Sequence, residues 1–541
     1  MRRLASPLHR AVRRLGGPGM VALLVGFLAW GGWFIYRTSV VVASQRYFSL
    51  FDDAMIPMTY ARNLVEGHGL NWARHSEPVE GFTSPLWTAL MVPVNALPVA
   101  LEYRSLIVQL LALTILAVHL VLVRKLVARH FADAHPAAAT ALPAAVLTAF
   151  YYPFDFWGLM GMETALQGLV TTAAVYLALE VVDGRRERLP GLFAVLAAAY
   201  LVRMDMALVI VAVLVFLVAQ GAVRRDDRRR WLAGLAGLAL VAGGYQLFRW
   251  LYFHDALPNT YYLKMTGIPL EVRLLQGLAS FTTFFRAHLA LLLAVGIGCA
   301  PLLRRRPKWW LPASLFVLAA AYSVYVGGDA WEGELRANRF LAVAMPQLFV
   351  LANALLNELL AALARRFGAG AQPAWRTYAA AATTAFLVLA TNGLAPSPAT
   401  ERNWKVVTVT ERPSHVTSHA LVLSELNRFK RRVRPRAVVA VQWAGIPAYF
   451  SDYLLVDLFG FNDRRIAHEK CADPLGPDNF DRYRPGHAKR DYTYVLAEKR
   501  PDAFFQAWGV PEEILAPIME RSGYRQVDGF WLRRGSPRVR R

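Results

Sequence analysis

The sequence predicts an α-helical polytopic membrane protein that ends in a small extracytoplasmic α/β domain. Of its 541 residues, 56% are hydrophobic, and most of about the first 395 lie in long apolar runs separated by short basic clusters. Such runs are predicted to be helices, because lipid offers no water to satisfy backbone polar groups. The remaining residues form shorter β-branched and aromatic segments, which are typical of strands.

The net charge of +22 does not indicate a nucleic-acid partner. Lys and Arg gather between the apolar runs, as the positive-inside bias of membrane proteins requires. Cys299 lies in an apolar run and Cys471 in a polar region, so no disulfide framework is predicted. The first apolar stretch has a charged start but no small-residue cleavage site after it, which favours an uncleaved first span over a signal peptide.

The basic clusters determine the predicted topology. Placing them all on the cytoplasmic face gives about eleven spans, a cytoplasmic N-terminus and an outside C-terminal region. The clusters are 2–14, 124–129, 185–188, 224–230, 304–308 and 365–376. The candidate spans are 18–36, 104–123, 137–153, 164–182, 189–201, 204–222, 231–252, 284–303, 309–326, 340–364 and 375–393.

Two apolar segments are short for a membrane span. "PLWTALMVPVNALP" has about fourteen residues, and segments of that length are more often interfacial or re-entrant. We count 189–201 as a span because it forms a hairpin with 204–222 around "VRMD" and keeps both flanking basic clusters inside. The acidic, aromatic and amide residues then gather in outside loops, where we expect the chemistry. These loops are 37–103, 154–163, 203–205, 253–283 and 327–339.

The C-terminal region is predicted to be an α/β domain of about 140 residues. "AVVAVQ", "YLLVDLFG" and "YTYVLAEK" have strand composition. "PEEILAPIMERSG" has a Pro and acids at its start and a Gly at its end, as a helix does. We therefore divide the chain into a transmembrane domain, 1–394, and an extracytoplasmic domain, 395–541.

A pair of adjacent acids, Asp52 and Asp53, opens "FDDAMIPMTYARNLVEGHGL" in the first outside loop. One acid at a helix start is explained by capping and by the helix dipole. A second adjacent acid repels the first, which favours a division of work between a general base and an orienting or metal-binding partner.

Cations and aromatic residues occupy the other outside loops. Arg203 and Asp205 in "LVRMD" form either a structural pair or part of a polar site. In "PNTYYLK", the tyrosines suit an interfacial belt or a sugar surface, and Lys264 either snorkels or binds phosphate. Arg336 and Arg339 in "GGDAWEGELRANRF" break the positive-inside pattern, for which an anionic lipid head group is a good reason.

Seven motifs in this order resemble the GT-C membrane glycosyltransferases. They are "FDDAMIPMTYARNLVEGHGL…VEGFTSPLW", "GMET", "RMD", "PNTYYLK", "GGDAWEGELRANRF", "DLFGFNDRRIAH" and "PGHAKRDY". The chain is most similar to the terminal β-(1→2)-arabinofuranosyltransferases and their bacterial relatives, some of which carry a flagellar-motor-control description. The likeness extends over nearly the whole chain.

The resemblance implies a glycosyltransferase of the bacterial inner membrane. The donor would be a polyprenyl-phosphate sugar, such as arabinofuranose or another pentofuranose, and the acceptor a cell-envelope glycan held partly by the C-terminal domain. Asp52 or Asp53 would be the base, with Asp52 favoured, and a divalent cation could be present or absent. The implied phosphate-binding residues are Lys264, Arg336, Arg339 and Arg203. Substrate binding falls to Arg62, His68, Glu80, Glu163, Asp205, Asn259, Tyr261, Tyr262 and Asp329.

Two other function classes compete with this interpretation. A transporter of lipid-linked sugars would need a polar path across the whole membrane, but the charged residues gather only toward the outer ends of the spans. A non-enzymatic envelope or motility protein would not need the intact acid pair. Both features favour the enzyme.

Overall fold

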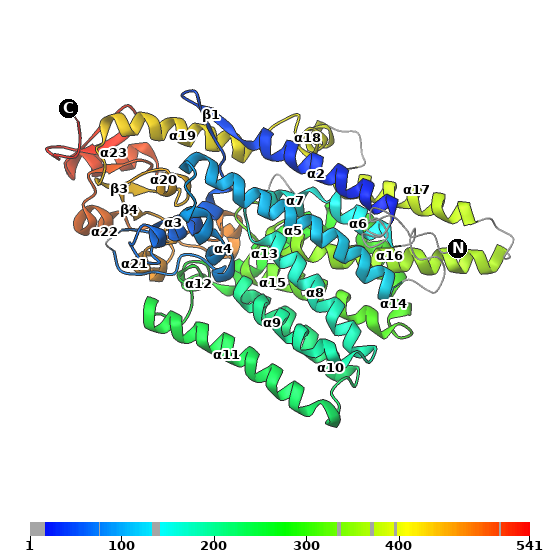
Figure 1. The fold of residues 1–541 in the computed structure, drawn as a ribbon. Coiled ribbons are helices and arrows are strands. Elements are labelled where there is room, and N and C mark those ends of the chain that lie inside the picture. Colours follow the sequence, from blue (N-terminus) through cyan, green and yellow to red (C-terminus); the bar gives the residue numbers. More distant parts are fainter. Residues whose placement is uncertain are drawn as a thin grey trace.

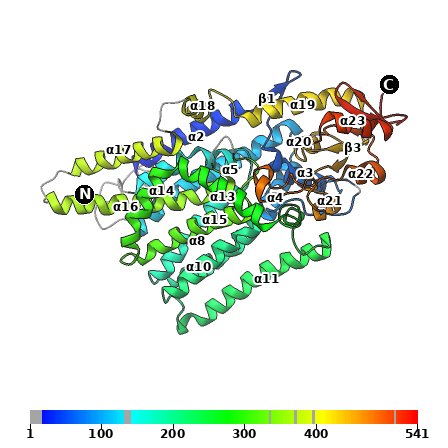
Figure 2. The same cartoon turned by 180° about the vertical axis from the view of Figure 1, so that it is seen from behind.

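The computed structural model describes residues 17–540 except 75, 132–140, 333–336, 368–372, 394–397 and 508–509. The helices of the first part run side by side as a bundle, and the C-terminal sheet lies at one end of it (Figure 1). Both views place α3 (Asp52–Val65) and α4 (Pro85–Ala96) at this same end, beside the sheet (Figure 2). The chain is thus a helical multi-pass protein with a C-terminal sheet-containing region, and this part of the prediction is confirmed.

Within the described ranges, six helices are long and apolar enough to cross a membrane. A seventh span results if α13 (Leu270–Ala287) and α14 (Leu289–Leu303), which are bent by 88° at their junction, count as one. The six are α2 (Pro18–Thr38), α5 (Leu101–His130), α8 (Thr164–Val182), α11 (Arg228–Phe253), α15 (Trp310–Val326) and α16 (Arg339–Phe367).

The predicted count of about eleven spans is not confirmed. Hydropathy marks an apolar run without fixing where the helix inside it breaks, and several predicted spans contain helices well short of about 20 residues. "PLWTALMVPVNALP" does form a short helix, α4, as expected for a segment that does not span. The remaining helices of this part are α6 (Leu142–Ala149), α7 (Tyr152–Leu159), α9 (Leu189–Val202), α10 (Ala207–Ala219), α12 (Asn259–Met265) and α17 (Pro373–Asn392).

The C-terminal region contains a five-stranded mixed sheet in the order β4-β3-β5-β7-β6. β3 pairs in parallel with β4 and β5, whereas β7 is antiparallel to both β5 and β6. The strands are β3 (Val438–Val441), β4 (Leu454–Asp457), β5 (Ala503–Phe504), β6 (Tyr524–Val527) and β7 (Phe530–Arg533). The predicted strands at 437–442 and 453–460 and the helix at 511–523, α23 (Glu512–Arg521), are confirmed.

The predicted strand "YTYVLAEK" is wrong, because this segment is helical. It begins as α22 (Tyr492–Tyr494) and continues as a wider helical turn over 495–499. Asp491 caps the helix, since its carboxylate accepts the N–H of Tyr494 at 2.8 Å. The strand position next to β3 belongs instead to β5, whose two residues are too few for a periodic pattern.

The C-terminal region packs into the helical part instead of standing apart from it. Buried residues of α19 (Ser414–Arg432) and β3 belong to the same hydrophobic core as the membrane helices. The division into 1–394 and 395–541 stays a prediction, since one core runs through both parts. The other elements are the hairpin β1 (Val40–Val42) and β2 (Gln45–Tyr47), and the helices α18 (Pro398–Val407), α20 (Ile446–Tyr449) and α21 (Arg464–His468).

Candidate active site

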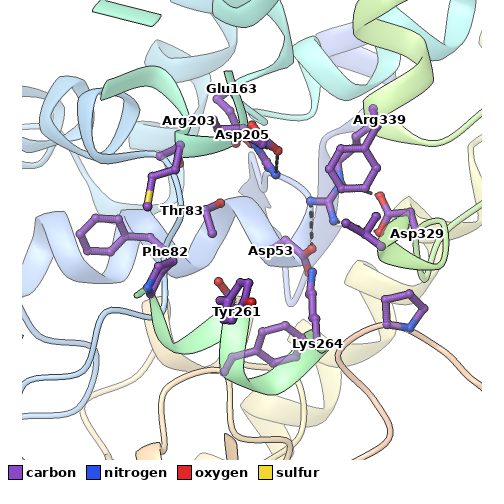
Figure 3. A pocket seen from close by; sticks show the side chains of 18 of the residues that line it. Asp53, Phe82, Thr83, Glu163, Arg203, Asp205, Tyr261, Lys264, Asp329 and Arg339 are labelled. Carbon is purple, nitrogen blue, oxygen red and sulfur yellow. Dashed lines mark hydrogen bonds and ion pairs between the residues drawn. The ribbon is translucent and has the colours of Figure 1, made fainter. Parts of the chain in front are cut away.

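A cavity of about 190 Å³ lies where the predicted outside loops meet the C-terminal region (Figure 3). Its walls come from the start of α3, the end of α15, the start of α16, and residues 81–84, 162–163, 203–205, 257–258, 260–261, 264–265 and 328–329. Phe461 and Pro485 add a wall from the C-terminal region. Segments far apart in sequence therefore line one cavity.

Asp53 is the member of the acid pair that faces this cavity (Figure 3). Arg339 donates from Nη1 to its Oδ2 at 3.1 Å, and 23% of the Asp53 side chain stays exposed. Asp329 holds the same guanidinium through bonds of 2.7 Å from Nε and 3.0 Å from Nη2. Burial alone would raise the pKa of Asp329, but the charge and hydrogen bonds of Arg339 lower it to about 2. Asp329 therefore keeps Arg339 in place, and Arg339 orients Asp53.

Asp52 points away from the cavity, into the C-terminal region. Its carboxylate accepts the backbone N–H groups of Gly445 at 3.1 Å and Ile446 at 2.7 Å, and so caps α20. A Cβ on Gly445 would lie 1.9 Å from the main-chain oxygen of Asp52, which shows how closely the two segments approach. Burial raises the pKa of Asp52 to about 7, although the two N–H groups oppose this shift.

Arg203 is bound by two carboxylates at the opposite wall. It donates to Glu163 at 2.6 Å and, through Nε and Nη2, to Asp205 at 2.7 to 3.1 Å. The "LVRMD" motif thus has both predicted features, since Arg203 and Asp205 form an ion pair and also line the cavity. Glu163, the second partner of Arg203, lines the cavity as well. The bonds of Arg203 use three of its five N–H groups, and the two carboxylates compensate its charge.

Lys264 is the cation best placed to meet an added anion. Among the described residues, no hydrogen bond or ion pair holds its ammonium group, and Phe461 lies below it at 5.9 Å from Nζ to the ring centroid. Burial lowers the pKa of Lys264, with a further contribution from Arg339, while the charges of Asp329 and Asp53 oppose the change. The described charged residues that line the cavity comprise four carboxylates and three cations, so an incoming phosphate depends strongly on this lysine.

Two first-loop residues that we assigned to substrate binding instead hold the structure together. Arg62 donates to Asp452 and to Glu66, each at 2.7 Å, and to the Tyr449 carbonyl at 2.6 Å. Glu80 is buried against Arg249. Neither Arg62 nor Glu80 lines the cavity, and His68 also lies outside its walls.

In the "PNTYYLK" loop, some residues line the cavity and others contact the C-terminal region. Tyr261 lines the cavity and is 39% exposed. Tyr262 stacks on His468 with ring centroids 4.0 Å apart, and Asn259 donates from Nδ2 to the carbonyls of Gly460 and Phe461 at 2.8 and 2.9 Å. The last two therefore join the loop to the C-terminal region and do not face the cavity.

Sequence reasoning missed several residues that build or support the site. Arg249 lies inside an apolar run, which is the expected signal for a residue with a polar partner, here Glu80. Phe461 and Pro485 line the cavity from the motifs "DLFGFNDRRIAH" and "PGHAKRDY", to which we had assigned no residue role. Arg336, a predicted phosphate ligand, lies outside the described residues. Within the described ranges, no group of three or more His, Cys, Asp or Glu side chains could hold a metal ion, so we assign no site to a cation.

Two family models match parts of the chain, each over less than a third of it. Residues 87–244 match the model described as Dolichyl-phosphate-mannose-protein mannosyltransferase, and residues 416–539 match a Domain of unknown function (DUF8728). No curated protein sequence matches the chain significantly. Among solved structures, the crystal structure of ArnT from Cupriavidus metallidurans bound to undecaprenyl phosphate aligns at 13% identity and a TM-score of 0.46. That alignment covers 81% of this chain and 86% of the other.

The match over 87–244 supports the coarser part of the predicted resemblance, to membrane glycosyltransferases of the GT-C type. It includes Glu163, Arg203 and Asp205 but reaches neither the acid pair nor Lys264 and Arg339. It also does not distinguish arabinofuranose from another sugar.

Proposed function

We propose that the protein is a membrane glycosyltransferase that moves a sugar from a polyprenyl-phosphate donor to an acceptor hydroxyl. One observation carries the proposal: a partly exposed carboxylate, Asp53, and an ammonium group without a described partner, Lys264, line the same cavity at the sheet-covered end of the helices. The description of the family matched at 87–244, with its dolichyl-phosphate-linked mannose, supports this class of donor.

Asp53 acts as the general base in this proposal. It takes the proton of the acceptor hydroxyl as the new bond forms between the acceptor oxygen and the anomeric carbon. The bond from that carbon to the phosphate oxygen breaks, and its electron pair leaves with the lipid phosphate. Arg339 holds the base in position, so that little reorganisation is needed when the proton moves.

Lys264 compensates the charge that develops on the departing phosphate. An ammonium is a compact point charge with three donors, which suits a phosphate oxygen. Arg203 and Arg339 contribute at longer range while they remain bound to their carboxylates. Of the cations predicted to bind the phosphate, Lys264 is thus the principal ligand in this proposal, and Arg203 and Arg339 are supporting charges.

The finer predictions remain proposals. These are a pentofuranose such as arabinofuranose as the sugar, a cell-envelope glycan as the acceptor, and the bacterial inner membrane as the location, with a cytoplasmic N-terminus. The extracytoplasmic placement of the C-terminal domain is favoured by the basic clusters of the sequence. The proposed reaction proceeds with or without a divalent cation.

The purified protein in proteoliposomes provides the test. We expect it to release polyprenyl phosphate from a radiolabelled polyprenyl-phosphate pentofuranose when an envelope glycan is present, and to label the glycan in equal amount. A panel of donors with other sugars on the same lipid identifies the sugar. Failure of every polyprenyl-phosphate donor to be consumed would overturn the proposed reaction.

A further inference from the structure

The short helix α12, which carries Lys264, depends on contacts from outside itself. It has only seven residues, and isolated helices of that length are unstable in water. The last four carbonyl groups of a helix also lack partners within it. Two of these four carbonyls, those of Tyr262 and Lys264, accept hydrogen bonds from the C-terminal region. Both donors lie in its part "YRPGHAK", which we call the Tyr483–Lys489 segment.

Lys489 caps two helices at once with a buried ammonium group. Its Nζ donates to the Tyr262 carbonyl at 2.9 Å, to Thr266 Oγ1 at 3.4 Å and to the Ala467 carbonyl at 2.6 Å. The three acceptors match the three N–H donors of a lysine. The two carbonyls lie at the C-terminal ends of α12 and α21, where a positive charge is favourable. Lys489 forms no ion pair with any carboxylate that the structure describes.

The same segment also touches Lys264 directly. Tyr483, whose side chain is buried, donates from its hydroxyl to the Lys264 carbonyl at 2.9 Å. Gly486 lies against the lysine side chain, since a Cβ at this position would be 3.2 Å from Lys264 Cε and 2.9 Å from Phe461 Cζ. Gly486 has a φ of +85°, a conformation that favours glycine. Both the backbone and the stem of Lys264 are thereby fixed.

We infer that Lys489 and Tyr483 are positioning residues of the donor site, which hold the Lys264 ammonium where it meets the lipid phosphate. The inference rests on the proposed function and extends it. The C-terminal region would then be part of the donor site itself, in addition to any role in holding an acceptor. Its sequence motif "PGHAKRDY" gains a physical role in binding a lipid-linked phosphate.

A double-mutant cycle between Lys489 and Lys264 tests the inference, with a short-chain polyprenyl monophosphate as the probe and calorimetry in detergent micelles as the measurement. We expect Lys489→Met to weaken binding about tenfold, because three acceptors lose a charged donor and the buried Ala467 carbonyl is among them. The Tyr262 carbonyl keeps the N–H and the hydroxyl of Thr266, which preserves the last turn of α12. In the Lys264→Met background the same change should weaken binding less than about twofold, since the group that it positions is already gone.

Tyr483→Phe provides a milder version that keeps the ring and removes one hydrogen bond, with an expected loss of about threefold. It decides the question if Lys489→Met does not fold. The matched control is Tyr524→Phe, because the Tyr524 hydroxyl also donates to a buried carbonyl, that of Pro501 at 2.7 Å, but within the sheet domain. This control should bind the probe as the wild type does.

Three outcomes would overturn the inference, and they separate it from the proposed function. If Lys264→Met itself leaves probe binding unchanged, the assigned phosphate role of Lys264 fails, and the inference fails with it. If Lys264→Met weakens binding but folded Lys489→Met and Tyr483→Phe do not, the inference alone fails. Equal losses from Lys489→Met in both backgrounds would show that Lys489 acts independently of Lys264.

Discussion

Replacing Asp53 with Asn removes the proposed base while keeping its size. Asn cannot take a proton from the acceptor, and loss of a general base slows a reaction by about 10² to 10⁴-fold. The fold should survive, because Arg339 remains held by Asp329 through bonds of 2.7 and 3.0 Å. We therefore expect Asp53→Asn to lower the rate of transfer by that factor at saturating donor, with little change in the melting temperature.

Asp52→Asn is the matched control, since it removes the same charge one residue away. The amide oxygen of Asn can still accept the N–H of Ile446, which lies 2.7 Å from Asp52 Oδ1. The bond to Gly445, at 3.1 Å, is the one at risk. A hydrogen bond of this kind contributes about 0.5 to 1.5 kcal/mol. Even if all of it were lost from the transition state, transfer would slow only about tenfold.

The assay is single-turnover transfer from a radiolabelled polyprenyl-phosphate sugar, run on Asp52→Asn, Asp53→Asn and the double variant. The double variant should be about as slow as Asp53→Asn alone, apart from the small Asp52 effect. An Asp53→Asn protein that transfers at the wild-type rate, or an Asp52→Asn protein slower than Asp53→Asn, would refute the assignment of the two acids.

Four other changes have defined outcomes. Lys264→Met should raise the donor KM about tenfold or more while the acceptor KM stays constant, since one charge-assisted contact to the phosphate is lost; steady-state kinetics with each substrate varied in turn measures this. Glu80→Gln should lower stability by about 3–5 kcal/mol, because Arg249 is left buried without its counter-charge; unfolding in detergent, followed by circular dichroism, measures the loss. Gly445→Ala should lower both activity and melting temperature, as a Cβ would lie 1.9 Å from the Asp52 main-chain oxygen. Burial raises the pKa of folded Asp52 from 3.8 to about 7, so its stabilising contribution is complete below pH 3.8 and is lost as the pH rises through 7. The melting temperature of the wild type should therefore fall more between pH 4 and 8 than that of Asp52→Asn.

Much of the fold could be predicted because apolar length and charge distribution are local properties of a sequence. The long helices α2, α5, α8, α15 and α16 follow from runs that can be read directly. Their number could not be predicted in the same way, since helix breaks such as the 88° bend between α13 and α14 depend on packing.

In the C-terminal region, local pattern succeeded where strands are buried and failed where capping decides the structure. β3 lies in the interior of the sheet and β4 at its edge, and both are apolar strands in which three of the four residues are buried. "YTYVLAEK" has similar composition but follows Asp491, whose carboxylate starts a helix. The cap is a single residue, whereas the strand-like composition extends over eight residues. The prediction followed the composition and therefore assigned a strand.

The members of the site were easier to predict than their roles. Asp53, Glu163, Arg203, Asp205, Tyr261, Lys264, Asp329 and Arg339 all line the cavity. Arg62, Glu80 and Asn259 occur in the same loops with the same chemistry, yet they bind other parts of the protein. A polar residue in an outside loop has no sequence mark that separates a substrate contact from a contact with the C-terminal region.

The doubled acid illustrates why the second domain was needed to interpret the first loop. Successive residues of an α-helix point about 100° apart, so two adjacent acids at the start of α3 face different surroundings. Asp52 faces α20, nearly 400 residues later in the chain, and Asp53 faces the cavity and Arg339. The like charges are therefore each satisfied by a separate partner, which removes the need for both to be catalytic. A pair that looked like a shared site in the sequence becomes one residue that docks the C-terminal region and one that is available for chemistry.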